Sequence, residues 1–445
     1  MKAKPPVMHE EEERGHSCPP SAATEDPGPL PASWRAAPMG DFLTVAQYGM
    51  SVKGGPEGRC PILRMTNQVN GSISPTKLQY AEITDREPAN FCVQRGDILF
   101  NRTNSLELVG RTSVFDIPGE FVFASYLIRL RTLPDQLDPF FLNLYLNADA
   151  TQKRLKSTAT RGVSQSNISA TRLRTFTVPV PPLPEQQKIA AELGMVGRAM
   201  EQQERLLALT AELKKTLLHQ LFTQGLRHEP QKQTDIGPVP ESWELMPLGS
   251  LAKVGNGSTP KRDNEAYWNG GTIPWLNSAR IHDRFITEPD QFVTDLAAKE
   301  CHLPRVKPNS LLIAITGQGK TLGNSALTRF ETCINQHLAY AQFTSDKVMP
   351  EFVLWFMQTR YNHLRSIAQA AGSTKGALTC GYLKTYPIPV PTIEEQTEIA
   401  KVFTALDAKE QSHHRKHATL STLFRTLLHQ LMTAQIRLVN LSLQQ

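Results

Sequence analysis

Residues 178–190 read VPVPPLPEQQKIA and residues 388–400 read IPVPTIEEQTEIA, so one proline-rich stretch occurs twice, 210 positions apart. Downstream, TLLHQL occurs at 216–221 and again at 426–431, with the same offset. No insertion therefore separates the two blocks in either copy, and the segment between them is one structural unit used twice. A period this long indicates duplication of a domain, because solenoid repeats are much shorter.

The start of each copy repeats as well, as GPLPASW at 28–34 and GPVPESW at 237–243. Each copy thus begins with a tryptophan segment, continues as a globular domain, and ends in the proline-rich stretch and a helix. An acidic, proline-containing segment without hydrophobic periodicity precedes the first copy and indicates a mobile tail. We predict a mobile N-terminal tail at 1–27, globular domains at 28–184 and 228–393, long helices at 185–227 and 394–437, and a tail at 438–445.

The composition is that of an ordinary globular protein. The 445 residues suffice for two or three domains, and 40% are hydrophobic and 20% charged. A net charge of +6 permits nucleic-acid binding without requiring it. No apolar run of membrane-spanning length and no secretory pattern occurs, so we expect a cytoplasmic protein.

The cysteines are scattered, without the close spacing of metal ligands. This distribution favours reduced thiols over a disulfide or zinc framework, and we expect no metal site. The cysteines are Cys18, Cys60, Cys92, Cys301, Cys333 and Cys380.

Each globular domain contains strands and then a helix. Short apolar runs at 97–100, 126–130, 274–276 and 311–315 are separated by Gly, Asn and Pro, as is typical of strands and turns. Helices are predicted from Asp138 to about Lys156, with Pro139 at the first helical position, and again from near Pro350. The predicted fold class is α+β, with two tandem mixed α/β domains and two long helices.

An apolar stripe marks the long helix after each proline-rich stretch. About forty helical residues span roughly 60 Å. Because each half has no other helix of this length, we expect the two helices to pair as an antiparallel coiled coil, with packing against their own domains as the alternative. The stripe residues are Ile189, Leu193, Val196, Met200, Leu206, Leu209, Leu213, Leu217 and Leu221 in the first copy and Ile399, Phe403, Leu406, Leu420, Leu423, Leu427 and Leu431 in the second.

Residues 314–321, AITGQGKT, match the relaxed phosphate-loop pattern and follow an apolar strand. In such a loop, backbone amides and Lys320 would bind phosphates and Thr321 would bind magnesium. A phosphate loop must open into a helix, however, and here 325–330 reads as another strand. A phosphate-loop nucleotide-binding enzyme is therefore kept as an alternative, testable by ATP binding that is lost with Lys320→Ala.

Catalytic patterns are otherwise weak. Asp138-Pro139-Phe140-Phe141 is similar to an amino-methyltransferase motif, but it lacks the second proline and a preceding glycine-rich cofactor loop. At the corresponding place the second copy has Met349-Pro350-Glu351-Phe352, so the segment is interpreted as a helix start. The pattern of the chain favours a binding protein without catalysis.

Taken in order, these segments resemble the specificity subunit of type I restriction-modification systems over residues 28–437. GVSQSNI at 162–168 leads to the first proline-rich stretch, and GST at 372–374 leads to the second. GSTP at 257–260, YWNGG at 267–271 and IPWL at 273–276 resemble the opening of one type of target recognition domain. RGDILFNR at 95–102 with GR at 110–111 resembles the middle of another.

The resemblance implies two target recognition domains, each reading one half of a bipartite, asymmetric DNA site. It also implies that the two helices separate these domains, set the spacer and dock two modification (methyltransferase) subunits, and that restriction/translocase subunits join the complex. S-adenosylmethionine and ATP with magnesium would then bind those partners, with no cofactor in this chain. The segment TAEL at 210–213 resembles a family unit whose copy number varies. A coiled-coil adaptor without a DNA role is the other alternative, and it would lack salt-dependent DNA affinity.

Candidate DNA-binding residues are polar side chains in the loops of each domain. Arginine and lysine suit guanine edges, and asparagine and glutamine suit adenine edges. For each residue, a phosphate contact or ordinary surface charge is the alternative. The candidates are Arg102, Asn104, Arg111, Arg161, Gln165 and Asn167 in the first domain and Lys261, Arg262, Asn277, Arg280, Lys320 and Lys375 in the second.

Overall fold

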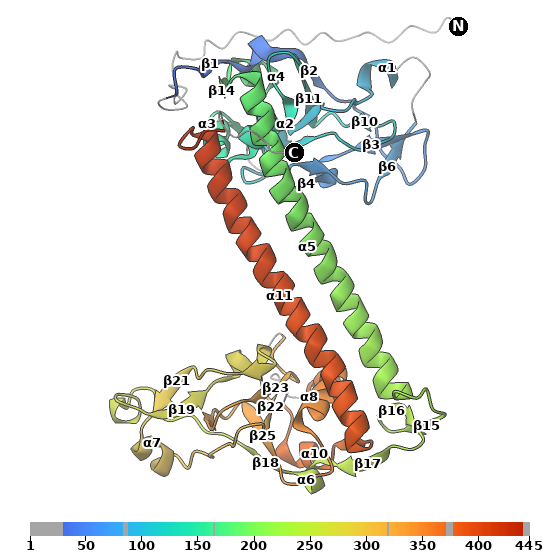
Figure 1. The fold of residues 1–445 in the computed structure, drawn as a ribbon, viewed down its shortest axis with the longest axis vertical. Coiled ribbons are helices and arrows are strands. Elements are labelled where there is room, and N and C mark those ends of the chain that lie inside the picture. The colour runs from blue at the N-terminus through green and yellow to red at the C-terminus, as the bar shows by residue number, and fades with distance from the viewer. Residues whose placement is uncertain (1–29, 83–87, 163–164, 318–319, 371–376, 439–445) are drawn as a thin grey trace, which may run out of the picture. The chain divides into compact units, whose positions relative to one another are not determined.

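The protein is described by a computed structural model that covers residues 30–82, 88–162, 165–317, 320–370 and 377–438. The chain forms two compact units, unit 1 (Met1–Glu201 with Ala418–Gln445) and unit 2 (Gln202–His417). Each unit holds one sheet-containing domain and parts of both long helices (Figure 1). The predicted tail at 1–27 and most of 438–445 lie outside the described residues.

Unit 1 is built on a sheet that is buried on both faces. Ile98 and Phe100 pack into one apolar cluster, and Leu99 between them packs into another. Since successive strand residues face opposite sides, a sheet covered on both sides needs a continuous apolar run, as in this strand. The strand order is β2 (Leu43–Tyr48), β11 (Leu127–Thr132), β7 (Ile98–Asn101), β9 (Thr112–Val114), β5 (Ser72–Ile73) and β4 (Gln68–Val69), beside a second sheet of β10 (Val122–Phe123), β3 (Cys60–Leu63) and β6 (Gln79–Ala81).

Unit 2 repeats this pattern. Leu311 and Ile313 face one apolar cluster and Leu312 and Ala314 face another. The main sheet is β18 (Ala252–Asn256), β25 (Leu338–Phe343), β22 (Leu311–Ala314), β23 (Ser325–Thr328) and β20 (Phe285–Ile286), beside β21 (Gln291–Val293), β19 (Ile273–Leu276) and β24 (Cys333–Ile334).

The predicted helix from Asp138 to Lys156 is two helices, α2 (Pro139–Asn147) and α3 (Asp149–Ser157). The Asp138 carboxylate accepts from the Phe141 N–H, which confirms the predicted start. The prediction of one continuous helix was wrong because Ala148 is extended (ψ 139) at the junction. No proline or glycine marks that break. Unit 2 has the corresponding pair α8 (Pro350–Thr359) and α9 (Tyr361–Ala370), joined at Arg360.

The proline-rich stretches form strands that close each domain. β14 (Thr177–Val180) pairs with β1 (Arg35–Pro38), and β26 (Pro387–Val390) pairs with β17 (Glu244–Pro247). Gln186 then donates to Gln136 O and Pro181 O and accepts from the Asp138 N–H. Gln396 makes the same three bonds, with Lys347 O, Pro391 O and the Met349 N–H. The repeated glutamine therefore ties each stretch to the start of α2 or α8.

The glutamates next to these glutamines connect each domain to the end of the opposite long helix. Glu185 accepts from the Trp34 indole at 3.1 Å and from Arg437, which follows α11 (Ile393–Met432), at 2.7 Å. In unit 2, Glu395 accepts from the Trp243 indole at 3.2 Å and from the Leu226 N–H, which follows α5 (Leu183–Gln224), at 3.0 Å. This common bonding explains why the tryptophan and the glutamate recur together.

Both long helices end earlier than predicted, at Gln224 instead of 227 and at Met432 instead of 437. Gly225 (φ 66) and Ala434 (φ 56) adopt the left-handed conformation that terminates helices. Among the described residues, no helix combines the length and apolarity that crossing a membrane requires.

Within each unit the two helices pair antiparallel, as predicted. Ile189 and Leu193 share an apolar cluster with Leu427 and Leu431 in unit 1, and the ends of α5 and α11 meet in the same way in unit 2. The middle of the predicted stripe was wrong, however. Leu209 and Leu213 are 51% and 49% exposed, whereas Thr210 and Lys214 are buried. Leu423 is likewise exposed.

Candidate nucleic-acid interface

In unit 1, backbone bonds bring three separate loops together at one end of the main sheet. The Asn101 N–H donates to Arg111 O at 2.8 Å, which closes the loop between β7 and β9. The Arg102 N–H donates to Tyr126 O at 3.1 Å, and its carbonyl accepts from the Ile168 N–H at 2.9 Å. Arg102 is therefore fixed where the three loops meet.

Unit 2 repeats these bonds with different residues. The Ala314 N–H donates to Asn324 O at 2.9 Å and closes the loop between β22 and β23. The Ile315 N–H donates to His337 O at 3.0 Å, and its carbonyl accepts from the Leu378 N–H at 2.8 Å. Ile315 thus occupies the backbone position of Arg102, and His337 that of Tyr126.

A fourth loop joins each set at a glycine. A Cβ on Gly49 would lie 2.3 Å from Phe123 O, and one on Gly257 would lie 1.9 Å from Ile334 O. Only glycine permits so close an approach. The four converging segments, which we call the loop end, are 48–50, 101–104, 124–126 and 166–168 in unit 1 and 256–259, 314–317, 335–337 and 377–378 in unit 2.

The loop end of unit 1 gathers predicted DNA-binding residues. A small sheet of β12 (Thr160–Arg161), β13 (Ser166–Asn167) and β8 (Thr103–Asn104) places Asn104, Arg161 and Asn167 on adjacent strands. The Arg102 guanidinium lies 4.5 Å from the ring centroid of Tyr48 and donates to Asn167 Oδ1 at 3.4 Å. The sequence prediction missed Tyr48, which is 39% exposed.

Three further features complete unit 1. The Asn104 amide contacts Met65 Sδ at 3.0 Å. Gln165 lies just before β13, where its carbonyl accepts from the Gly162 N–H. Arg111 instead lines a hollow of about 500 Å³ with Glu107 and residues of α2, α3, α5 and α11. Five of the six candidates therefore lie in the loop end or directly beside it, and the side chain of Arg161 lies outside the described residues.

In unit 2 the predicted residues are spread over several loops. The Arg262 guanidinium stacks 4.0 Å from the Trp268 ring centroid and donates to Gln291 at 2.5 Å. Lys261 is exposed, and its carbonyl accepts from the Trp268 indole at 3.0 Å. Asn277 caps a short helix by accepting from the backbone N–H two residues later.

Arg280 and Lys320 also have defined surroundings. Arg280 forms ion pairs with Asp283 at 3.2 Å and Asp290 at 3.8 Å. Lys320 is exposed in the turn between β22 and β23. Because β23 returns antiparallel to β22, no helix follows that turn, and the phosphate-loop alternative has no support. Lys375 lies outside the described residues.

A chain of hydrogen-bonded polar side chains that sequence reasoning missed crosses the loop end of unit 2. Thr259 Oγ1 donates to Gln336 Oε1. Gln336 Nε2 lies 3.3 Å from His337 Nε2, and His337 Nδ1 lies 2.5 Å from Thr316 Oγ1. In the sequence these residues are isolated among apolar strands, so only the backbone frame brings them together.

Residues 40–211 and 240–422 each match the family described as type I restriction modification DNA specificity domain. The two matches span most of the chain and correspond to its two copies. The chain belongs to the type I restriction-modification specificity family. This membership confirms the resemblance seen in the sequence and the general role of DNA specificity.

Individual members of the family resemble the chain over half of its length or more. The putative type I restriction enzyme MjaX specificity subunit of Methanocaldococcus jannaschii is 28% identical over 417 residues, covering 92% of this chain and 95% of the relative. The EcoR124I/EcoR124II specificity subunit of Escherichia coli is 22% identical over 237 residues, covering 53% and 56%. The solved S subunit of the type I restriction-modification system from M. genitalium gives a TM-score of 0.62 at 18% identity, covering 89% and 96%. This structural likeness confirms the α+β architecture with long helices.

Where α5 and α11 pair in unit 2, a charge cluster surrounds buried Lys214 and Asp407, with Glu410 and Arg284 partly exposed. Lys214 Nζ lies 2.7 Å from Asp407 and 3.0 Å from Glu410, and 5.0 Å from the Trp355 ring centroid. Arg284, from the loop before β20, also bonds Asp407. Burial alone would raise the pKa of Glu410, but its hydrogen bond from Lys214 and the nearby positive charges lower that pKa below its ordinary value.

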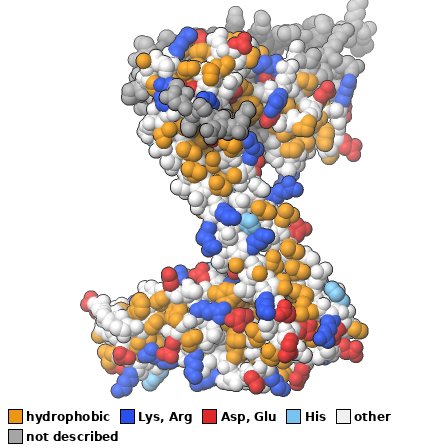
Figure 2. All heavy atoms as spheres, viewed as in Figure 1, with side chains coloured by type: hydrophobic (Ala, Val, Ile, Leu, Met, Phe, Trp, Pro, Cys, Tyr) orange, Lys and Arg blue, Asp and Glu red, His pale blue; other side chains and the backbone are white. Residues whose placement is uncertain are grey.

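The visible surface of this family member carries no single sign of charge. On the face drawn in Figure 2, lysine and arginine side chains lie among acidic ones over unit 2. The described residues contain no group of three or more His, Cys, Asp or Glu side chains placed to hold a metal ion. The described cysteines are free, and burial raises the pKa of Cys333 to about 11, which makes that thiol unreactive near neutral pH.

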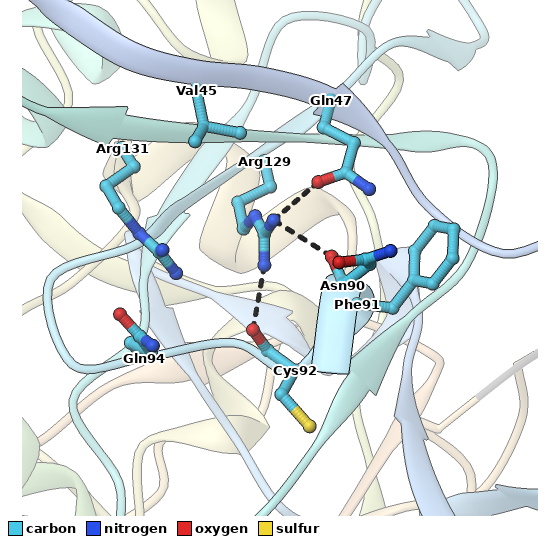
Figure 3. A pocket seen from close by; sticks show the side chains of 8 residues that line it. All are labelled: Val45, Gln47, Asn90, Phe91, Cys92, Gln94, Arg129 and Arg131. Atoms are coloured by element: carbon cyan, nitrogen blue, oxygen red, sulfur yellow. Dashed lines mark hydrogen bonds between the residues drawn. The ribbon is translucent and has the colours of Figure 1, made fainter. Parts of the chain in front are cut away.

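Figure 3 shows a hollow of about 480 Å³ in unit 1 that presents two arginines, Arg129 and Arg131. Arg129 donates to Cys92 O at 2.7 Å and to Gln47 at 2.5 Å, and burial lowers its pKa below the usual value. Arg131 donates to both carboxylate oxygens of Asp97 at 2.7 Å. Since these donors are used within the domain, both arginines hold the fold together and are not assigned to DNA.

Proposed function

We propose that this chain supplies the DNA specificity of a type I restriction-modification complex, with each unit reading one half of a bipartite, asymmetric site in double-stranded DNA. The observation that carries the proposal is that the two loop ends share one backbone frame but present different side chains. Arg102 stands where unit 2 has Ile315, and Tyr126 stands where it has His337. Different donors and acceptors select different bases, so two unlike half-sites are expected.

The chemistry of the complex is assigned to its partners. Two modification subunits would methylate adenine with S-adenosylmethionine, and restriction subunits would translocate and cut with ATP and magnesium. This chain would contribute recognition without catalysis, in the cytoplasm where the host DNA lies. Support comes from family membership and from the loop ends, where side chains suited to base edges converge.

The helices are proposed to set the spacer between the half-sites. α5 is continuous from Leu183 to Gln224 and contributes residues to both units. Four residues inserted after Leu213 add about one helical turn and should lengthen the spacer by about one base pair. An unchanged spacer in the methylated motif of that variant would show that the helices do not measure distance.

The function is tested by sequencing methylated adenine in genomic DNA, with and without an in-frame deletion of this gene. Loss of a split, asymmetric methylated motif on deletion is the expected result, and it defines both half-sites and the spacer. An unchanged methylome in a strain whose modification subunit co-purifies with this chain would reject the proposal. The DNA affinity of the purified complex should also fall steeply with salt, as phosphate neutralisation requires.

A further inference from the structure

We infer that unit 2 reads its half-site through a chain of four hydrogen-bonded polar side chains, Thr259–Gln336–His337–Thr316, in which Gln336 recognises an adenine. This inference rests on the proposed function and adds the residues that decide the sequence read by one half. It also assigns the arginines predicted for unit 2 to roles inside the domain.

The position of these four side chains follows from the backbone hydrogen bonds that the two loop ends share. In unit 1, Thr103 pairs with Asn167 across the small sheet, and Arg102 precedes Thr103. In unit 2, Thr316 pairs with Ala377 in the same way. The residue before Thr316 is Ile315, which is 6% exposed and part of the core. Unit 2 thus lacks an arginine and an asparagine at the two positions that carry them in unit 1.

The side chains that fill this surface come from three loops. Gln336 and His337 are exposed, and Thr259 and Thr316 are half-buried beside them. Buried Asn335 accepts from the His337 N–H at 3.1 Å and so fixes the turn that presents both exposed residues. A donor or acceptor that is already held in place loses less conformational entropy when a base binds.

The loop that carries Thr259 is anchored on both sides. The buried Trp275 indole donates to Ser258 O at 3.3 Å, and the Trp268 indole donates to Lys261 O at 3.0 Å. Arg262 stacks on Trp268 and completes this anchor. Arg262 is therefore a positioning residue that holds the loop, and its guanidinium is already engaged.

Hydrogen-bond capacity supports adenine as the base read by Gln336. Its Oε1 accepts from Thr259 and keeps a second lone pair, while its Nε2 contacts His337 and keeps a second N–H. A glutamine amide with one free acceptor and one free donor matches the N6–H and N7 edge of adenine in the major groove. The contacts of Gln336 with Thr259 and His337 can therefore persist while its amide forms two hydrogen bonds to the adenine.

The test compares methylation motifs made in cells by complexes that carry the wild-type chain, Gln336→Ala or the control Gln342→Ala. Gln342 lies in β25, the strand that follows His337, and is near the end of that strand away from the loop end. Gln336→Ala should relax one adenine position in one half-site roughly tenfold and leave the other half unchanged. The control should keep the wild-type motif.

The outcomes separate this inference from the proposed function. If the wild-type complex gives no bipartite motif, the function itself fails. If wild type gives one and Gln336→Ala keeps full selectivity at every position of both halves, the inference is overturned.

Loss of all methylation in Gln336→Ala would be resolved by equilibrium binding. The purified complex would be titrated with duplexes that carry each of the four bases at each half-site position. Selectivity relaxed at one adenine of one half-site supports the inference, and selectivity retained at all positions overturns it. The same titration with His337→Ala asks whether the chain acts as a unit, in which case the same position relaxes.

Discussion

α5 and α11 pair in both units, but at three corresponding positions the residues are charged in unit 2 and uncharged in unit 1. Lys214, Asp407 and Glu410 form the charge cluster of unit 2, and their counterparts 210 positions away are Phe424, Gly197 and Met200. In unit 1, Phe424 and Met200 line a hollow beside α2, whose other lining residues are mostly polar. The antiparallel pairing is thus compatible with an ionic or an apolar seam, so the repeated ends of the helices, and not the middle, specify it.

The largest expected effect comes from breaking the ionic seam. Lys214→Met leaves buried Asp407 and half-buried Glu410 with only Arg284 as a partner, and should cost about 3 kcal/mol of unfolding free energy. Denaturant unfolding of the purified complex measures this loss.

A matched triple variant sharpens the comparison. Lys214→Phe with Asp407→Gly and Glu410→Met gives unit 2 the residues of unit 1 and should recover part of the loss, since an apolar seam of similar volume often replaces a buried ion pair. Arg284 then loses both carboxylate partners, but its side chain is 31% exposed and can be solvated. Equal instability of the single and triple variants would mean that unit 2 depends on these charges specifically.

The second effect concerns the frame shared by both loop ends. Gly257→Ala places a Cβ 1.9 Å from Ile334 O, so backbone must shift, at a cost of about 1–3 kcal/mol. The control Gly197→Ala, where nothing lies within 4 Å of the new atom, should stabilise α5 by about 0.5–1 kcal/mol. Thermal unfolding of the complex distinguishes the two directions. A neutral Gly257→Ala would show that the close approach at the loop end is not required.

The third effect is on unit 1 alone. Arg102 lies over Tyr48 at the loop end, and arginine is suited to guanine. Arg102→Ala should relax one guanine position of one half-site roughly tenfold, while the half-site read through Gln336 keeps its selectivity. The methylated motif provides the measurement. Relaxation in the same half-site as Gln336→Ala would contradict the assignment of one half-site to each unit.

The duplicated stretches made the architecture predictable. The recurrence of the proline-rich stretch and of the tryptophan segment at nearly the same offset defined the two domains, and the Asp138 cap depends on residues that are neighbours in sequence. The buried Lys214 could not be predicted, because its burial depends on carboxylates 193 and 196 positions away. The predicted apolar stripe through Leu209 and Leu213 therefore fitted the helical period, although α5 buries a different face there.

The candidate site could also be predicted only where its residues are close in sequence. In unit 1 the polar residues cluster around two short segments, so five of six candidates gathered at one end of the sheet. In unit 2 the gathering depends on bonds between loops near 259, 316 and 336, which no local pattern reveals. Arg262 was predicted to bind DNA from its residue type and loop position, and its stacking on Trp268 could not be seen in the sequence.

The smallest expected effect is a difference between the two units in how acid weakens α11. The folded-state pKa of Glu410 lies below its ordinary value of 4.5, so its stabilisation is fully present above about pH 4.5 and is lost as pH falls through the lower folded value. Met200, its counterpart, does not titrate. Hydrogen exchange should therefore show acid weakening α11 near 403–413 more than near 424–431, and Glu410→Gln should reduce that difference. If the variant and wild type lose protection equally at every pH, the Lys214–Glu410 contact contributes nothing to the pH dependence of unit 2, and the ionic seam acts through Asp407 alone.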